Sequence, residues 1–106
     1  MIAACKLTGG TMAAYFIAQI KITREEAWPE YRRQIAALIE RFGRKYIVRG
    51  GTVEVLEGSH DGRRLAIAEF PSMEAIRSFW SSPDYVPIKK LREGAGIVDV
   101  WAVPGV

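Results

Sequence analysis

Residues 13–42 read AAYFIAQIKITREEAWPEYRRQIAALIERF, and the spacing of their apolar side chains changes once along the way. The first part, Ala13 to Ile22, alternates between two faces, which predicts a β-strand. One face of this strand carries Phe16, Ala18, Ile20 and Ile22. From Trp28 onward the apolar residues return every three or four positions, which predicts a helix that buries one side. The domain therefore begins with a strand followed by an amphipathic helix.

The ends of this helix are marked by residue type. Thr23, followed three residues later by Glu26, has the spacing of a capping box. Pro29 is compatible with the first turn, where backbone N–H groups have no partner within the helix. Gly43 supplies a C-terminal stop. We therefore expect the helix to begin shortly after Thr23 and to end before Gly43.

The middle of the chain predicts two further strands. Lys45 to Glu57 is expected to be the second strand, interrupted at Gly50-Gly51, where a bulge or a close approach of backbone or ligand is expected. Asp61-Gly62 is the predicted hairpin turn. Arg64 to Phe70 then returns as the third strand, antiparallel because so short a connection leaves no room for a parallel crossover.

The last third of the chain predicts a helix and a final strand. Ser72 is placed to cap the helix. Ser82-Pro83 restarts it with a second cap and a first-turn proline, and Gly94 and Gly96 end it. Ile97 to Val103 is the fourth strand.

This order, β-α-β-β-α-β, predicts an α+β fold of the ferredoxin-like type, a four-stranded antiparallel sheet with two helices on one face. Residues 12–106 are expected to form this single domain, and residues 1–11 an N-terminal tail. The final strand, IVDVWAV, carries apolar residues on both faces, so the face without helices also needs cover. A second copy of the chain, packed sheet against sheet about a two-fold axis, is the simplest cover, and we expect a homodimer.

Length and composition exclude several classes of protein. The 106 residues suffice for one core, and 49% hydrophobic with 25% charged residues is typical of a globular domain. The net charge of +3 comes from basic residues spread along the chain, without the clustered stripe of a nucleic-acid binder. No apolar run is long enough to cross a membrane as a helix. A single cysteine, Cys5, and a single histidine, His60, favour a reduced, cytoplasmic protein without a structural metal, a haem or another cofactor.

Several short motifs occur together in this chain. They are Arg49-Gly50-Gly51, Glu57-Gly58, Glu69-Phe70-Pro71-Ser72, Ser82-Pro83-Asp84-Tyr85 and Arg92. In this order and at these spacings, residues 13–106 resemble a family of small dimeric α/β-barrel proteins, the domain of unknown function number thirteen-thirty. The chain departs from the family pattern at two turns. Gly43-Arg44 stands where the family has a Gly-Gly pair, and Ser59-His60-Asp61-Gly62 stands where the family has a more proline-rich turn.

The resemblance implies a ferredoxin-like subunit that dimerises into an α/β barrel, and it implies no particular reaction. The wider superfamily of dimeric α/β barrels includes cofactor-free quinol monooxygenases, haem-handling enzymes and lactone isomerases. These serve as analogies alone, since a fold does not carry its chemistry with it.

Glu69 is the first candidate for chemistry because it lies within the apolar third strand. A carboxylate in or beside a core is costly to bury without a partner. Pairing across Asp61-Gly62 is expected to place Thr52 to Glu54 opposite Glu69, with Arg49 a few positions beyond. Two readings follow. Glu69 forms a buried ion pair with Arg49 or Arg92, or it is a general acid or base beside an arginine that binds an anionic substrate.

Other polar residues complete the candidate site. Tyr85 begins the continued helix, where its hydroxyl either donates to a ligand in a cleft or bonds to the backbone as an anchor. Glu57 is either an exposed charge beside the turn or, as the family pattern implies, part of a pocket mouth. Asp99 is expected to hydrogen-bond to a neighbouring strand, a helix end or the second subunit, and His60 is expected in an exposed turn.

Two main functions stay open on this basis, and a haem or metal protein is a third alternative that the single histidine does not favour. The first is a cofactor-free enzyme or a binder of a small anionic, enolic or aromatic molecule, with Glu69 moving a proton and Tyr85 donating a hydrogen bond as catalytic residues. Its substrate-binding residues are Arg49, Gly50, Glu57 and Arg92. The second is a non-catalytic dimer, an interaction or stress-related module, in which the same residues fix the interface. An enclosed pocket with converging polar groups favours the first function, and a filled core favours the second.

Overall fold

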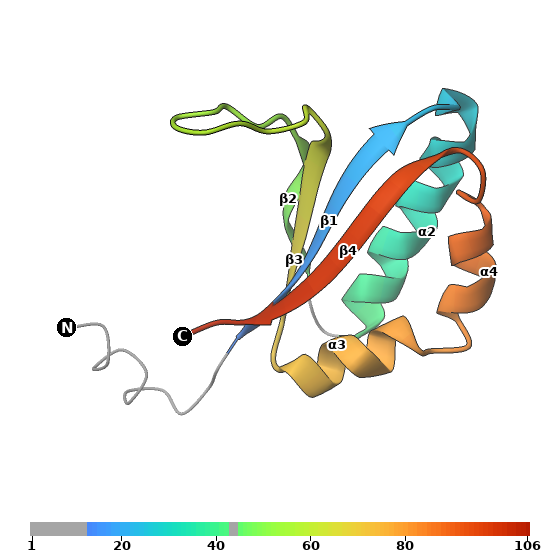
Figure 1. The fold of residues 1–106 in the computed structure, drawn as a ribbon. Coiled ribbons are helices and arrows are strands. Elements are labelled where there is room, and N and C mark those ends of the chain that lie inside the picture. Colours follow the sequence, from blue (N-terminus) through green and yellow to red (C-terminus); the bar gives the residue numbers. More distant parts are fainter. Residues whose placement is uncertain (1–12, 43–44) are drawn as a thin grey trace.

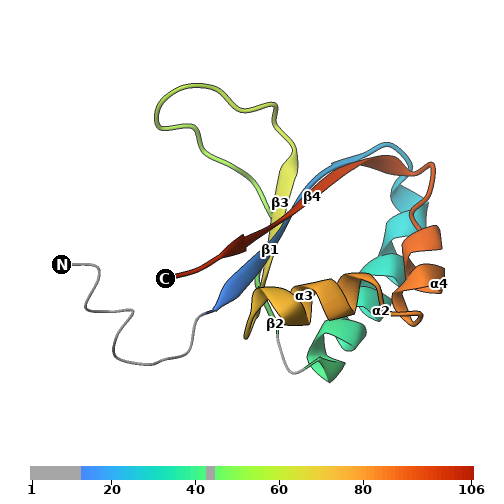
Figure 2. The ribbon, with the colours of Figure 1, turned by 60° about the horizontal axis from the view of Figure 1, so that its bottom comes forward.

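The computed structural model describes residues 13–42 and 45–106, and its four strands form one antiparallel sheet (Figure 1). The elements in chain order are β1 (Ala14–Ile22), the short 3-10 helix η1 (Glu25–Ala27), α2 (Trp28–Arg41), β2 (Lys45–Gly51), β3 (Arg64–Phe70), α3 (Met73–Trp80), α4 (Tyr85–Lys90) and β4 (Gly96–Pro104). The strands lie in the order β2-β3-β1-β4, and the helices cover one face (Figures 1 and 2). The predicted ferredoxin-like arrangement is confirmed. The predicted tail, residues 1–11, and the predicted stop at Gly43 lie outside the described residues.

The first helical segment begins differently from the prediction. Residues 25–27 form η1, and α2 starts at Trp28 without a side-chain cap, so the capping box of Thr23 and Glu26 does not form. The reason is tertiary: the backbone N–H groups of Thr23 and Arg24 both donate to the carbonyl of Ala95, at 2.9 and 3.0 Å. Thr23 is thereby held against the segment that leads into β4. Pro29 lies in the first turn of α2, as expected.

The second helical segment is broken in two. Ser72 caps α3 as predicted, and its Oγ accepts a hydrogen bond of 3.0 Å from the N–H of Ala75. Ser82 does not cap α4 directly: its Oγ accepts from the N–H of Asp84 at 3.1 Å, and α4 begins one residue later, at Tyr85. Pro83 therefore lies in the turn between the helices and not in the first turn of α4.

No helix in the described part of the chain is long and apolar enough to cross a membrane.

The core lies between the sheet and the helices. Alternate residues of β1 and β3 face it, and in β3 these include the small side chains of Ala66 and Ala68. The largest fully buried side chains are Trp28, Tyr85, Phe70, Phe79, Ile35, Leu38 and Ile39. The indole N–H of Trp28 donates to the carbonyl of Ala95 at 3.0 Å, so this one acceptor serves three donors. The start of α2 and the start of β4 are thus joined inside the core.

The other side of the sheet, here called the open face, carries no helix of the described chain (Figure 2). Its side chains come from the alternate positions of the strands. The register aligns Val48 with Ile67, Ile67 with Ile17, and Ile17 with Trp101 in one apolar row across the four strands. Trp101 and Val103 are 45% and 40% exposed. The prediction that apolar residues also lie on the face without helices is confirmed for the single chain.

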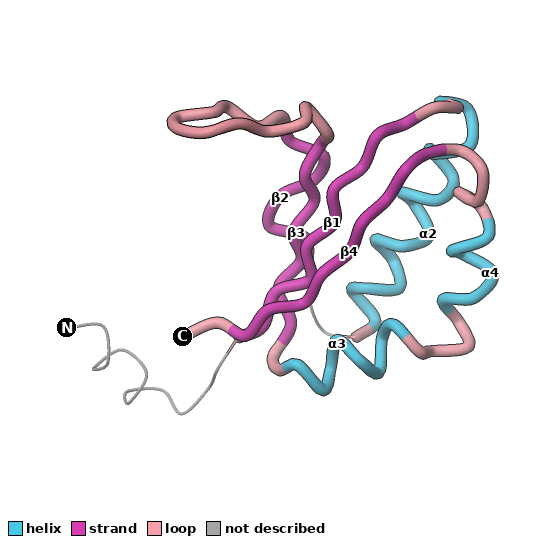
Figure 3. Tube along the Cα trace, viewed as in Figure 1, coloured by secondary structure: helices cyan, strands magenta, loops and turns pink. Residues whose placement is uncertain are grey.

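Residues 52–63 form a long loop, here called the arm, that stands out from the sheet on the side of the open face (Figures 1 and 3). The prediction of a second strand reaching Glu57 is wrong, because β2 ends at Gly51. Gly50 adopts a φ of +71°, which interrupts the extended conformation as a bulge, and the pairing with β3 resumes at Gly51 and ends there. The predicted tight turn at Asp61-Gly62 is therefore only the last part of a much longer connection.

Candidate functional site

A pocket lies between α2 and the helix-covered face of β1, β3 and β2. It encloses about 100 Å³, and about 570 Å³ of empty space when its open mouth is included. Its floor is apolar and comes from Ile20, Ile22, Trp28, Ile35 and Ala66. Its remaining lining residues are Tyr31, Arg32, Tyr46, Arg49, Gly50 and Arg64. The pocket therefore combines an apolar interior with a rim of arginines and tyrosines.

The rim is strongly basic. Arg64 Nη1 donates to the carbonyl of Gly50 at 3.3 Å, and the Arg49 guanidinium stands 5.6 Å from the centre of the Tyr46 ring. Arg32 Nη2 lies 3.6 Å from a carboxylate oxygen of Glu25, which is exposed and does not line the pocket. None of the described residues that line the pocket is acidic. Such a rim is suited to the carboxylate or other anionic head of a small ligand.

A β-bulge brings Arg49 to this pocket. Tyr46 pairs with Ala68 and Val48 with Ile67, so two steps along β2 match one step along β3. In a regular strand Tyr46 and Arg49 would point to opposite faces, because they are three residues apart. The extra residue, Ile47, turns both side chains toward the helices. The predicted bulge at Gly50-Gly51 also forms, one step farther along the strand.

Behind the pocket, Tyr31 belongs to a buried polar cluster. Its hydroxyl lies 3.2 Å from the hydroxyl of Tyr85, and Arg92 Nη2 donates to Tyr85 at 3.4 Å. The Arg92 guanidinium also lies 5.4 Å from the centre of the Tyr31 ring, in cation–π geometry. Arg92 Nε is buried and has no hydrogen-bond partner among the described residues. Tyr31 is thus held from behind by one tyrosine and one arginine.

The protonation states of these groups follow from burial. Burial raises the pKa of Tyr31 well above its ordinary value of 10.0, and burial likewise raises the pKa of Tyr46. Both phenols are therefore neutral at physiological pH. Burial lowers the pKa of Arg92, but the oxygens of Tyr31 and Tyr85 raise it, and the net shift is upward. The cluster accordingly holds one fixed positive charge beside the neutral phenol of Tyr31.

The structure brings together four of the six residues that the sequence nominated. Arg49 and Gly50 line the pocket, whereas Tyr85 and Arg92 lie behind it and contact Tyr31. Tyr85 is buried, as the alternative of a helix anchor predicts, but its hydroxyl contacts the side chains of Tyr31 and Arg92 and not the backbone.

Glu69 lies elsewhere, on the open face. The expected pairing of Glu69 with Thr52 to Glu54 is wrong, because the register places Lys45 and Tyr15 opposite it. The long arm explains the error: β2 ends before residue 52, so the beginning of β2 pairs with the end of β3. In the described part of the chain Glu69 forms no ion pair with Arg49 or Arg92, and Arg49 faces the other side of the sheet.

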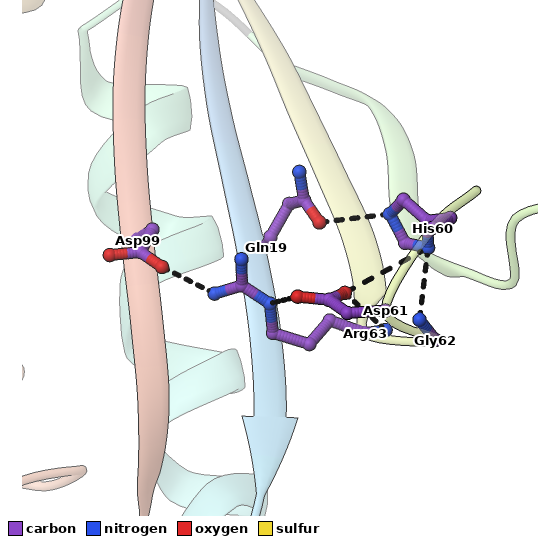
Figure 4. Close-up of polar contacts among 6 residues, drawn as sticks. All are labelled: Gln19, His60, Asp61, Gly62, Arg63 and Asp99. Carbon is purple, nitrogen blue, oxygen red and sulfur yellow. Dashed lines mark hydrogen bonds and ion pairs between the residues drawn. The ribbon is translucent and has the colours of Figure 1, made fainter. Parts of the chain in front are cut away.

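The remaining nominated residues belong to the arm and the open face. Glu57 is exposed in the arm, away from the pocket. Asp99 accepts a hydrogen bond of 2.5 Å from Arg63 Nη1, which belongs to the end of the arm and reaches across β1 (Figure 4). Among the described residues its partner is therefore a loop residue, and not a neighbouring strand or a helix end as expected. His60 is not an exposed turn residue: it is half-buried, with Nε2 at 2.9 Å from Gln19 Oε1.

Sequence reasoning missed four pocket residues, Tyr31, Arg32, Tyr46 and Arg64. Tyr31 lies in the apolar stripe of α2, where helical spacing predicts a core residue and gives no sign of a pocket. A signal for Arg64 was available, because it lies two residues before Ala66 and therefore shares its face of the strand. No local sequence signal identifies Tyr46 as a pocket residue, because Tyr46 and Arg49 share a face of the sheet only through the bulge at Ile47. In residues 13–42 and 45–106, no three His, Cys, Asp or Glu side chains gather as a metal site would need.

Comparison with known proteins places the chain among proteins of similar fold. A family model described as a domain of unknown function (DUF1330) matches residues 13–106. A protein of unknown function from Rhodopseudomonas palustris is 19% identical, with a TM-score of 0.70 over 99% of this chain and 92% of that chain. No curated protein matches the chain.

Two further solved structures share the fold. SnoaB, a cofactor-independent oxygenase from Streptomyces nogalater, is 16% identical, with a TM-score of 0.55 over 86% of this chain and 90% of its own. A dimeric ferredoxin-like protein of unknown function from Thermobifida fusca is 14% identical, with a TM-score of 0.50 over 94% and 96% of the two chains. At these identities the similarity establishes the fold and not the chemistry.

Proposed function

The chain belongs to the DUF1330 family, and from its pocket we propose that it binds a small organic anion with a flat apolar body. The observation that carries this proposal is the convergence of Arg49, Arg64 and Arg32 on the rim of a pocket whose floor is apolar. A carboxylate or enolate head would meet the guanidinium groups at the mouth. A ring would lie inside, between the helix and the sheet.

The dimensions favour a single ring. An apolar cavity of roughly 150 Å³ holds a benzene molecule, and this pocket encloses about 100 Å³ and widens toward its mouth. The rings of Trp28, Tyr31 and Tyr46 supply flat surfaces for such a body. Gly50 leaves room beside Arg49, because a Cβ built on it meets nothing within 4 Å.

Tyr85 and Arg92 serve this site as positioning residues in our proposal. They do not line the pocket, but they hold Tyr31, which does. Glu69 and Glu57 lie outside the pocket, and we assign them to the surface between two subunits. A proton-transfer role for Glu69 would accordingly require a second site on the open face.

We further propose that the chain is a homodimer in which two open faces meet, in the reducing cytoplasm that its single cysteine favours. The support is the apolar row that ends in Trp101, which a single chain leaves exposed. The same fold is described as dimeric in the protein from Thermobifida fusca. A non-catalytic dimer that acts as an interaction module would use the same surface between subunits. Ligand binding in the pocket therefore distinguishes the two functions.

The test is titration of benzoate into the purified protein, followed by calorimetry. We expect Arg49→Ala and Arg64→Ala each to weaken benzoate binding by about tenfold or more, the loss typical of a charge-assisted hydrogen bond. Arg77→Ala is the matched control, because Arg77 is an exposed arginine of α3 that does not line this pocket. Equal benzoate affinity in Arg49→Ala and Arg77→Ala, or no benzoate binding to the wild type, would contradict the proposal.

A neutral analogue separates the contribution of charge from that of shape. Benzamide has the ring of benzoate without its charge, so it is expected to bind more weakly and to lose little affinity in Arg49→Ala. Native mass spectrometry of protein taken directly from cells complements this experiment. A reproducible small adduct that is lost in Arg49→Ala would identify the natural ligand by its mass.

A further inference from the structure

The arm, residues 52–63, carries the most exposed large apolar side chain among the described residues. Leu56 is 89% exposed, and its neighbours Val55 and Val53 are 47% and 38% exposed. Exposure of three aliphatic side chains to water does not stabilise a single chain, because the burial of apolar surface is favourable in free energy. Their position in a loop that leaves the sheet makes them available to another molecule.

The arm leaves the sheet in a fixed direction because its base is tied to the open face. Gly62 N–H donates to His60 Nδ1 at 3.1 Å, so the ring proton is on Nε2, which donates to Gln19 Oε1 at 2.9 Å (Figure 4). Arg63 pairs with Asp61 at 2.8 Å and with Asp99 at 2.5 Å. These contacts join the last part of the arm to β1 and β4. The end of the arm that leads into β3 is therefore fixed beside the open face.

The arm and the open face point the same way. In both ribbon views the arm stands on the side of the sheet opposite the helices (Figures 1 and 2). The open face carries its own exposed apolar residues, with Ile97 at 55% and Trp101 at 45% exposure. A two-fold axis through this face would bring the arm of each copy against the other copy. Each arm then covers apolar surface that the facing sheets leave at their margin.

We propose that the arm is an intersubunit clasp, whose Leu56, Val55 and Val53 pack on the second copy of this chain in the dimer. This inference rests on the proposed homodimer and adds to it, since two sheets can meet face to face with or without such a clasp. Symmetry makes the contact reciprocal, so one substitution removes two contacts per dimer. A clasp of this kind also explains why the loop is long and why its aliphatic side chains gather in its first half, whereas its second half is polar.

Photocrosslinking tests the clasp directly. Leu56→p-benzoylphenylalanine is expected to give a covalent dimer on irradiation. Val86→p-benzoylphenylalanine is the matched control, because Val86 is 53% exposed but lies on α4, on the helix side of the sheet. Trp101→p-benzoylphenylalanine reports on the open face itself. Sedimentation of the wild type measures the oligomeric state independently.

The outcomes separate the clasp from the dimer. Crosslinking at position 56 but not at 86, in a protein that sediments as a dimer, supports the clasp. A dimer that crosslinks at 101 but not at 56 overturns the clasp and leaves the homodimer standing. A monomer by sedimentation overturns both. In addition, Leu56→Ala is expected to raise the dimer dissociation constant by about tenfold or more, and Val86→Ala to change it by less than about twofold.

Discussion

The hydroxyl groups of Tyr31 and Tyr85 lie 3.2 Å apart inside the core, one on α2 and the other on α4. Both residues are nearly inaccessible, at 8% and 2% exposure. The pair is therefore a buried polar contact between two helices. Arg92 supplies the third member of this contact.

Removing either hydroxyl should destabilise the fold. We expect Tyr31→Phe and Tyr85→Phe each to lower the free energy of unfolding by about 1 kcal/mol, because each leaves the other hydroxyl buried with fewer partners. The double variant should lose less than the sum, since no buried hydroxyl then lacks its partner. Urea denaturation of the four proteins measures this. Strictly additive losses would show that the two hydroxyls do not interact.

Alkaline pH should unfold the protein through its tyrosines. Burial raises the pKa of Tyr31 above its ordinary value of 10.0, so above that pH the unfolded chain loses a proton that the folded chain retains. The free energy of unfolding is thus unaffected below about pH 10 and falls by about 1.4 kcal/mol per pH unit above it for this residue. Urea denaturation of the wild type and Tyr31→Phe at several pH values checks the slope. Ionisation of Tyr31 in the folded protein near pH 10, seen by absorbance, would refute the prediction.

Gly50 should be sensitive to substitution despite its open surroundings. At a φ of +71° any residue with a Cβ is strained, and Gly50→Ala is expected to cost about 1 kcal/mol of stability. It should also weaken benzoate binding, because Gly50 lines the pocket beside Arg49. Gly51→Ala is the comparison: its backbone has no positive φ, and the added Cβ would lie 3.3 Å from Val48 Cγ1. Thermal melts and calorimetry on both variants decide the point, and equal behaviour would count against backbone strain.

Gly96 is constrained by space and not by its backbone angles. A Cβ at this position would lie 2.6 Å from the carbonyl oxygen of Lys21 and 2.9 Å from Trp28 Cζ2. The strand and the buried indole cannot both move aside, so Gly96→Ala should lower stability by roughly 1–3 kcal/mol. Tryptophan fluorescence during urea denaturation follows the effect at Trp28. An unchanged denaturation midpoint would mean that the sheet relaxes more easily than its packing indicates.

Glu69→Gln distinguishes the two faces of the sheet. Because the carboxylate lies on the open face and the pocket lies on the helix face, benzoate affinity should change by less than about twofold. Its effect is expected instead in the dimer dissociation constant measured by sedimentation. A large loss of benzoate binding, in a protein that remains folded, would place the site on the open face and contradict our assignment.

The sequence was sufficient for the order of the strands and helices and for the two faces of β1, because these depend on local periodicity. The alternation in β1 and the cap at Ser72 are of this kind, and the structure confirms both. The start of α2 was not predictable, since Thr23 is drawn away from its capping role by the carbonyl of Ala95, which is distant in sequence.

The candidate site was predictable only in part, for a related reason. Arg49 and Gly50 stand in a recognisable motif, and they do line the pocket. Tyr46 joins them only through a bulge at Ile47, an ordinary strand residue that gives no sign of irregularity. Glu69 was misplaced because β2 ends at Gly51 and not at Glu57. The connection to β3 is therefore longer than predicted, and Glu69 pairs with Lys45 at the start of β2.

The single carbonyl of Ala95 also has a consequence for the order in which the chain assembles. It receives the N–H groups of Thr23 and Arg24 and the indole of Trp28, which lies 67 residues earlier in the sequence. During synthesis the first strand and helix leave the ribosome before this acceptor has been made. The junction between β1 and α2 therefore lacks this acceptor until residue 95 has been synthesised. Its hydrogen bonds are completed in one late, long-range step.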